Sequence, residues 1–331
     1  MHDFRRNDYD VTNSVQVSST AAVMAAVRQL FNSTWPRESF EPVERAFEDF
    51  DSLFAGRMPG YLGVDTVYHD RQHTLDMTLT MMRLLMGHER TAEEPARFGG
   101  ERGVMGLVTS LFHDAGYIRE TSDKEHRNGA EFTLYHVTRS AKFLARYLPV
   151  VDMQSWVPIA TRVVHFTGYE VQLDQIHLDD RRDRKLGHLL GTADLVTQMA
   201  DRCYLEKCRD RLYPEFVLGG IAAAAGASGV VQVKYSSGLD LLRQTPHFVR
   251  VARTTRLEAA FEHAYRFIEP LFNGRNPYMD AIDRNLAYLD RVLRSERWPL
   301  LRRRPPLFTS NENELAQVRG LMVSHLRAVW A

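Results

Sequence analysis

The sequence predicts an all-α fold, and three observations support this class. Apolar residues recur at the three- and four-residue spacing of amphipathic helices along most of the chain. No convincing series of alternating strands and no repeated strand–helix–strand pattern competes with that spacing. The composition, 331 residues with 44% hydrophobic and 25% charged side chains, is that of an ordinary globular protein.

The helices follow one another from the N-terminal end of the chain. The polar segment 1–14 is expected to fray, and the hydroxyl residues 18–20 then offer an N-cap. Val23, Val27 and Phe31 form an apolar stripe on the helix that follows this cap. Further helices are predicted over residues 42–54, 69–86, 103–114, 130–148, 157–165, 185–211, 239–247, 255–272, 278–293 and 311–330.

Two segments interrupt the helical pattern. Residues 219–238 are rich in Gly and Ala and predict a loose helix followed by a loop or a short extended piece. The Pro- and Arg-rich residues 297–308 predict a linker before the last helix. We find no internal repeat.

Charge and cysteine content exclude several classes of function. The 42 Lys and Arg balance 42 Asp and Glu, so no bulk attraction for nucleic acid or an anionic membrane is expected. Cys203 and Cys208 are five residues apart, which excludes both a disulfide scaffold and a Cys-x-x-Cys pair. The polar N-terminal residues and the lack of a run of about 18 apolar residues predict a cytoplasmic protein.

Histidines are concentrated in one part of the chain. Nine of the 13 lie between positions 69 and 188. His69 and His73 are one helical turn apart in the sequence YHDRQHTLDM, so both imidazoles can reach one site. Taken alone, this pair fits a site and an ordinary structural pair equally well.

The doublet His113–Asp114 shifts the balance toward a site. It ends the apolar run GLVTSLF and precedes a turn at Gly116, which would bring a nitrogen and a carboxylate ligand to the mouth of a helix bundle. His126, His165 and Asp194 follow, each at the edge of an apolar helix or within one. Asp194 alone fits an N-cap or a core salt bridge. The order of all these residues together indicates a metal site.

This order resembles the HD superfamily of metal-dependent phosphohydrolases, whose signature is a distant His, a central His-Asp doublet and a later Asp. The resemblance covers about residues 65–205. YHDRQHTLDM is similar to the cyclic-nucleotide phosphodiesterase motif Tyr-His-Asn-x-x-His-x-x-Asp-Val, matched at Tyr68, His69, His73 and Asp76. The resemblance implies an HD-domain helical bundle in which His73 is a metal ligand and His69 is the general acid.

The resemblance also implies a division of the chain and a ligand set. An N-terminal helical extension would cover residues 1–60, the metal-binding domain residues 61–275, and C-terminal helices 276–331 would pack on the bundle or at a subunit interface. The implied ligands of one metal are His73, His113, Asp114 and Asp194. Asp114 would also bridge to a second metal, which His126 and His165 would hold. The resemblance implies a catalytic role for Asp114 as well.

The match to the phosphodiesterase motif is incomplete. Tyr117 stands near the place of that motif's second histidine, and the segment FIEPLF at 267–272 lacks the glutamine that binds the nucleobase. His126, ahead of Gly129 and Ala130, resembles instead an element of HD proteins that hold two metals, and Glu125 beside it is a competing ligand. The remaining histidines of the cluster are interpreted as ordinary residues: His88, His136, His177 and His188.

Nitrogen and oxygen ligands without thiolate suit one or two divalent transition metals, Mn, Fe, Co, Ni or Zn, with Mg as a further option. Such a metal would generate a hydroxide that hydrolyses a phosphoester, with His69 protonating the leaving oxygen. The expected partner is a small-molecule phosphoester or nucleotide, such as a cyclic nucleotide. Neither nucleic acid nor a membrane is expected as a partner. The sequence does not decide whether the protein forms a homodimer. The charges near the motifs fit either phosphate binding or a solvated surface: Arg71, Arg119, Lys124, Arg202 and Lys234.

Two other functions fit the same ligands. Some HD relatives hold a mixed-valent di-iron centre with this ligand order and act as oxygenases. Others are non-catalytic regulatory modules that bind a nucleotide. The ligands alone do not separate the hydrolase from the oxygenase. Non-catalytic members usually lose ligands, whereas the set here is complete, which disfavours the regulatory module.

Overall fold

A computed structural model of the protein describes residues 5–225, 231–309 and 313–330. It confirms a mostly helical fold, with 67% helix and a single small sheet in the described part of the chain. The α-helices are α1 (Thr20–Thr34), α2 (Glu41–Phe54), α3 (Arg71–Thr91), α4 (Gly99–Phe112), α5 (His136–Tyr147), α6 (Val157–Val163), α7 (Arg181–Ala200), α8 (Tyr204–Lys207), α9 (Tyr213–Leu218), α10 (Gly238–Val251), α11 (Pro277–Ser295) and α12 (Glu314–Trp330). The strands are β1 (Ala223–Ala225) and β2 (Val231–Val233).

The core is built around α3. Every side chain from Gln72 to His88 is buried, because α1, α4, α7 and the 3-10 helix Ala264–Leu271 all pack against this helix. The helix begins where the Asp70 side chain accepts a hydrogen bond from the backbone N–H of His73, as an N-cap residue does. The first turn of α3, which carries His73, is thereby fixed inside the bundle.

The N-terminal segment is ordered from residue 5 onward, so the expected fraying is wrong for residues 5–14; residues 1–4 lie outside the described residues. Asp10 is fully buried and its carboxylate lies 2.7 Å from the Arg83 guanidinium of α3. The same carboxylate accepts hydrogen bonds from the backbone N–H groups of Ser14 and Val15, both at 2.8 Å. A polar sequence is held here by a buried ion pair, which hydropathy does not reveal.

Two long predicted helices are interrupted. The helix expected over 185–211 ends at Ala200, because Asp201 leaves the helical region with ψ 134°, and the chain resumes as α8. The helix expected over 255–272 is a π-helix, Ala252–Ala260, followed by a 3-10 helix. The two are separated by His263, which has a left-handed backbone with φ 57°.

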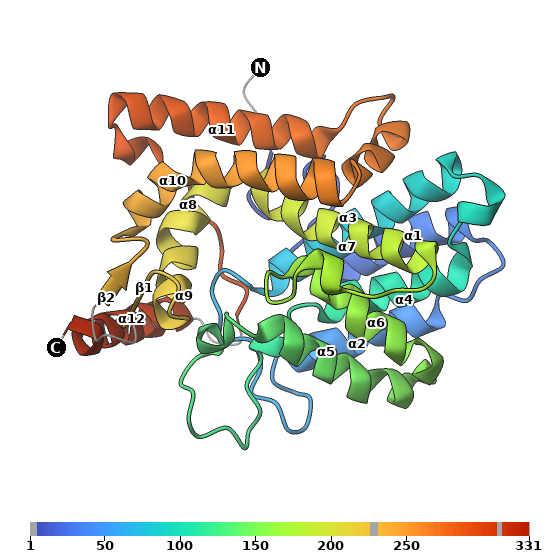
Figure 1. Ribbon diagram of the computed structural model, residues 1–331, viewed down its shortest axis with the longest axis horizontal. Coiled ribbons are helices and arrows are strands. Elements are labelled where there is room, and N and C mark those ends of the chain that lie inside the picture. Colours follow the sequence, from blue (N-terminus) through green and yellow to red (C-terminus); the bar gives the residue numbers. More distant parts are fainter. Residues whose placement is uncertain (1–4, 226–230, 310–312, 331) are drawn as a thin grey trace.

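The small-residue segment forms a hairpin. β1 and β2 pair antiparallel with Ala224 opposite Gln232, so the short extended piece is confirmed and the loose helix is wrong. Along the left of Figure 1, this hairpin lies beside α9, α10 and α12. In the same view α3 and α7 occupy the middle of the molecule and α11 runs along its upper edge.

Helices on both sides of the predicted domain boundaries pack against each other. α1 contacts α3 across residue 60, and α11 contacts α7 across residue 275. The Asn285 side chain of α11 donates hydrogen bonds to the carbonyls of Met199 and Asp201, both at 2.9 Å. α12 packs on α9.

Within the described residues, no helix is both long and apolar enough to span a membrane.

Candidate metal centre

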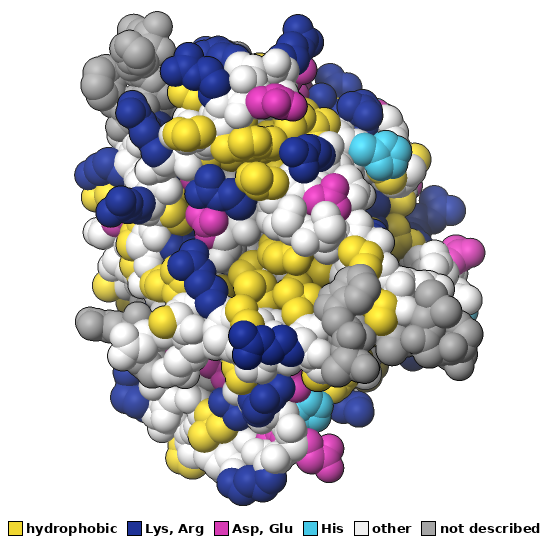
Figure 2. Space-filling view, turned by 90° about the vertical axis from the view of Figure 1, so that its left-hand side faces the viewer, with side chains coloured by type: hydrophobic (Ala, Val, Ile, Leu, Met, Phe, Trp, Pro, Cys, Tyr) yellow, Lys and Arg dark blue, Asp and Glu magenta, His cyan; other side chains and the backbone are white. Residues whose placement is uncertain are grey.

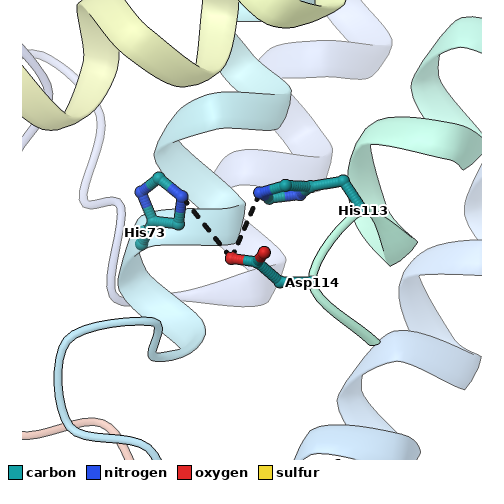
Figure 3. A group of neighbouring side chains, drawn as sticks. All are labelled: His73, His113 and Asp114. Atoms are coloured by element: carbon teal, nitrogen blue, oxygen red, sulfur yellow. Dashed lines mark ion pairs between the residues drawn. The ribbon is translucent and has the colours of Figure 1, made fainter. Parts of the chain in front are cut away.

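Three buried side chains from two elements converge in the core. His73 lies in the first turn of α3, His113 directly follows α4, and Asp114 is the next residue along the chain. One ligand atom from each lies within 4.8 Å of the other two. Figure 3 shows both imidazoles pointing toward the Asp114 carboxylate, with His73 Nε2 3.6 Å and His113 Nε2 3.2 Å from Oδ2.

Asp194, in the middle of α7, completes this group. Its Oδ1 lies 3.2 Å from His73 Nε2 and 4.0 Å from His113 Nε2. The structure therefore brings together the four residues that the sequence assigns to one metal. Two imidazole nitrogens and two carboxylates form a ligand set that suits a divalent transition metal.

The hydrogen bonding at His113 directs its Nε2 toward Asp114. Its Nδ1 lies 2.8 Å from the carbonyl oxygen of Ser110, so Nδ1 carries the proton and donates it. Nε2 is then an acceptor that faces Asp114 Oδ2, and both atoms are buried without a hydrogen-bond partner. Two buried acceptors in contact require a cation or a proton between them. The residues present thus fit a bound metal ion.

The pKa shifts of the pair indicate the same need for positive charge. Burial opposes the imidazolium form, but the Asp114 carboxylate outweighs burial and raises the pKa of His113 to about 9. Burial opposes the charged carboxylate as well, yet His113 and the other nearby histidines hold the pKa of Asp114 far below its usual range. A metal ion would take the place of the proton that His113 otherwise attracts.

His136, interpreted from the sequence as an ordinary residue, lies on the other side of Asp114. Its Nε2 is 3.8 Å from Asp114 Oδ1, and its Nδ1 is 2.8 Å from the carbonyl of Thr133. This repeats the arrangement of His113, in which the carbonyl three residues earlier fixes the imidazole. The sequence signal was only its position, at the start of the amphipathic helix α5.

His126 is not brought to Asp114. In the described part of the chain its imidazole contacts Asp123, Phe132 and Tyr135. Glu125 is exposed beside it.

His165 is half-buried, with its Nδ1 unpartnered, and burial lowers its pKa against the opposing charge of Glu170. Among the described contacts it has no ion pair with Asp114. The prediction that His126 and His165 hold a second metal is untested.

His69 lies beside the metal group and is held by a carboxylate that the sequence did not single out. Its Nδ1 is 2.6 Å from Oε2 of Glu215 on α9, a residue that is completely buried. Oε1 of Glu215 accepts the backbone N–H groups of Val67 and Tyr68, both at 2.6 Å. Burial disfavours charge on His69, but the Glu215 carboxylate outweighs it and raises the pKa of His69 above its ordinary value.

An aromatic stack connects His69 to the other face of the site. The Tyr117 ring stacks on His69 with centroids 4.5 Å apart and on His136 with centroids 4.3 Å apart. The centroids of the two imidazoles are themselves 6.1 Å apart. The stack fixes the planes of both imidazoles.

A cavity of about 510 Å³ opens onto this arrangement. Its wall includes His69, Asp114, His136 and Asp194, together with residues of α7, α9 and α10 and of the segments that flank β1 and β2. Its volume lies in the range of small-molecule sites, roughly 300–1,000 Å³. A candidate acid and a candidate metal group therefore face one cavity.

In comparisons with protein-family models, curated proteins and solved structures, nothing matches this chain.

Proposed function

We propose that the protein is a metal-dependent hydrolase of phosphate esters. One observation carries the proposal: a buried ligand group that needs a cation lies at the same cavity as a histidine whose pKa is raised by a buried carboxylate. A histidine held through Nδ1 by a carboxylate is suited to donate a proton from Nε2 to a leaving oxygen. Nucleotides are among the candidate substrates.

Different residues of the site would bind the metal ion and donate the proton. His73, His113, Asp114 and Asp194 would hold a divalent ion. When bound, that ion would supply a water of lowered pKa and positive charge for the phosphoryl oxygens. Glu215 orients His69 through Nδ1, which leaves Nε2 to donate a proton to the departing alkoxide. Tyr117 and the aromatic wall of the cavity limit access of bulk water to this proton.

The experiment uses chelator-treated protein reconstituted separately with Mn²⁺, Zn²⁺, Fe²⁺ and Mg²⁺. A panel of cyclic and linear nucleotides, alkyl phosphates and an aryl phosphodiester is then assayed for hydrolysis. We expect turnover of at least one ester by metal-loaded protein, loss of turnover in His113→Ala, and wild-type turnover in His177→Ala, whose side chain is exposed. Metal-loaded protein that hydrolyses no ester would refute the proposal, and nucleotide binding without turnover would favour a regulatory module.

A second function, a di-iron oxygenase, is favoured by His136. Its Nε2 faces Asp114 Oδ1 while the first ligand group faces Oδ2, so the carboxylate has nitrogen ligands on both sides. Such a pair of positions suits iron. Electron paramagnetic resonance of anaerobically prepared iron protein tests this alternative: a coupled di-iron signal with substrate-dependent oxygen uptake supports it, and their absence excludes it.

A further inference from the structure

The wall of the cavity beside the metal group is largely aromatic and aliphatic. Apart from the residues of the site itself, six aromatic rings line it. Stacked or buried rings of this kind stabilise an apolar ligand by removing its surface from water. The rings are Tyr68, Tyr169, Tyr204, Phe216, Tyr235 and Phe248.

The threonine and glutamine side chains of the wall already bond to the protein. Thr133, Thr167 and Thr245 donate their hydroxyl protons to backbone carbonyls within one helical turn. The Gln244 amide donates to the carbonyl of Lys234, and the Gln198 carbonyl accepts from the Tyr68 hydroxyl. Recognition of a nucleobase needs free donors and acceptors in fixed places, and these side chains provide few.

Positive charge is scarce in the wall. Lys234 is the single Lys or Arg among the described residues that line the cavity, whereas Asp114, Glu170 and Asp194 are carboxylates. Glu170 is already occupied, because it accepts the backbone N–H groups of Val137 and Thr138 at the start of α5. With a metal in place, these charges suit one phosphate group and not a polyphosphate chain.

Apolar side chains continue outward from the wall. Leu134, Tyr169 and Phe248 line the cavity although they are 61%, 62% and 38% exposed. Val233 beside Lys234, and Val251 one turn after Phe248, are exposed as well. On the face bearing α10 and the hairpin, Figure 2 shows hydrophobic side chains in a hollow with Lys and Arg side chains around it. An apolar group longer than the cavity would therefore still find an apolar surface outside it.

We infer that the substrate is the phosphate monoester of an extended apolar alcohol, an inference that rests on the proposed function. The phosphate lies at the metal group, and the alcohol occupies the aromatic chamber and its exposed rim. The oxygen of water bonds to phosphorus, and the bond from phosphorus to the alcohol oxygen breaks with its electron pair on that oxygen. His69 protonates this oxygen, and the proton released by the attacking water restores the imidazolium. The products are the free alcohol and inorganic phosphate.

Alkyl phosphonates test the inference without turnover, because their carbon–phosphorus bond is not an ester. Calorimetric titration of manganese-loaded protein with methyl, butyl, hexyl and octyl phosphonate gives Kd as a function of chain length. We expect Kd to fall about two- to fourfold for each methylene that enters the cavity. A Kd independent of chain length, or tighter binding of a 3′,5′-cyclic nucleotide than of octyl phosphonate, would overturn the inference.

A matched pair of variants locates the effect. Phe248→Ser, at the exposed rim, should weaken octyl phosphonate several-fold and leave methyl phosphonate unchanged. Val150→Ser removes an apolar side chain that is 64% exposed and not part of the wall, and should change neither. Equal loss for both phosphonates in Phe248→Ser would also contradict the inference.

The two proposals fail in different ways. Chain-length-dependent phosphonate binding without hydrolysis of any ester would refute the proposed phosphohydrolase and leave the apolar ligand class standing. Hydrolysis of small esters by a protein whose phosphonate affinity is flat would refute the inference alone.

Discussion

At the scale of single residues, the candidate site depends on which nitrogen of each imidazole is already in a hydrogen bond to the protein. His113 and His136 both use Nδ1 to reach the carbonyl three residues earlier, and both turn Nε2 to Asp114. His69 is bound differently, because Nδ1 meets the Glu215 carboxylate. The first arrangement suits a metal ligand. The Glu215 carboxylate raises the pKa of His69, which suits the proposed proton donor.

Replacing the carboxylate behind His69 should change the pH dependence of turnover. Glu215→Gln removes the charge that raises the pKa of His69, so the protonated acid would be lost at lower pH. We expect the alkaline limb of kcat to move toward lower pH, whereas His69→Ala removes the limb and lowers kcat about 10²- to 10⁴-fold. An unchanged pH profile in Glu215→Gln, with metal still bound, would show that His69 is not the acid.

Replacing His136 and replacing His126 should have different effects on the binding of a second ion. Because His136 faces Asp114 Oδ1 and His126 contacts Asp123, His136→Ala should lower the number of ions bound per chain and His126→Ala should not. Titration of chelator-treated protein with Mn²⁺, followed by equilibrium dialysis, measures both. Loss of an ion in His126→Ala alone would instead support the second-metal ligands that the resemblance implies.

At the scale of elements, the contact between His136 and Asp114 depends on the approach of α5 to the short 3-10 helix Ala115–Tyr117. The Arg139 side chain of α5 donates hydrogen bonds to the carbonyls of Gly116 and Ile118 at 2.7 and 3.1 Å. Gly116 permits the approach, because a Cβ there would lie 1.8 Å from the carbonyl oxygen of His136. Asp114 and His136 therefore reach each other only if residue 116 has no side chain.

Gly116→Ala should consequently separate α5 from Asp114. We expect a stability loss at the upper end of the roughly 1–3 kcal/mol that overpacking costs, together with weaker metal binding. Chemical denaturation and metal titration measure the two effects. Gly320→Ala on α12, where a Cβ would meet nothing within 4 Å, is the control and should be neutral or slightly stabilising. Wild-type behaviour of Gly116→Ala would contradict this account of the approach.

At the scale of the whole molecule, a buried polar network joins the N-terminal segment to the bundle. The Arg83 guanidinium of α3 bonds to Asp10 at 2.7 Å and to the Tyr278 hydroxyl of α11 at 2.6 Å. Burial alone would raise the pKa of Asp10, but Arg83 and the hydrogen bonds of the loop lower it to about 2. Residues 5–14 and α11 are thus held to the same helix that carries His73.

Breaking this network should destabilise the protein in a pH-dependent way. Asp10→Ala leaves Arg83 buried without its carboxylate, at a cost of about 3–5 kcal/mol. Because the folded pKa lies below the unfolded value of 3.8, the stabilisation by Asp10 is present above that value and is lost as pH falls through 2. Relative to the variant, the wild type should lose about 2 kcal/mol over this range in urea denaturation. Parallel pH curves would contradict the assignment.

The sequence predicted the helical class and most helix positions, because those depend on local periodicity. The resemblance to the HD superfamily singled out His73, His113, Asp114 and Asp194, which the structure brings together. The sequence could not predict His136 or Glu215, since each reaches the site through long-range packing: His136 by the approach at Gly116, and Glu215 through α9, which lies 146 residues from His69. The sequence also did not predict that the segment around Asp10 is fixed in place, and the reason is the same. A buried ion pair with a distant arginine leaves no periodic signal.

The central claim is that the group of His73, His113, Asp114 and Asp194 holds a metal ion. Elemental analysis of purified protein by mass spectrometry tests it most directly, with His113→Ala as the variant and His177→Ala as the control, both checked for folding by circular dichroism. We predict about one or two transition-metal ions per chain in the wild type and in His177→Ala, and a marked loss in folded His113→Ala. Wild-type protein that binds no metal after reconstitution, or His113→Ala that retains its full content, would contradict the claim.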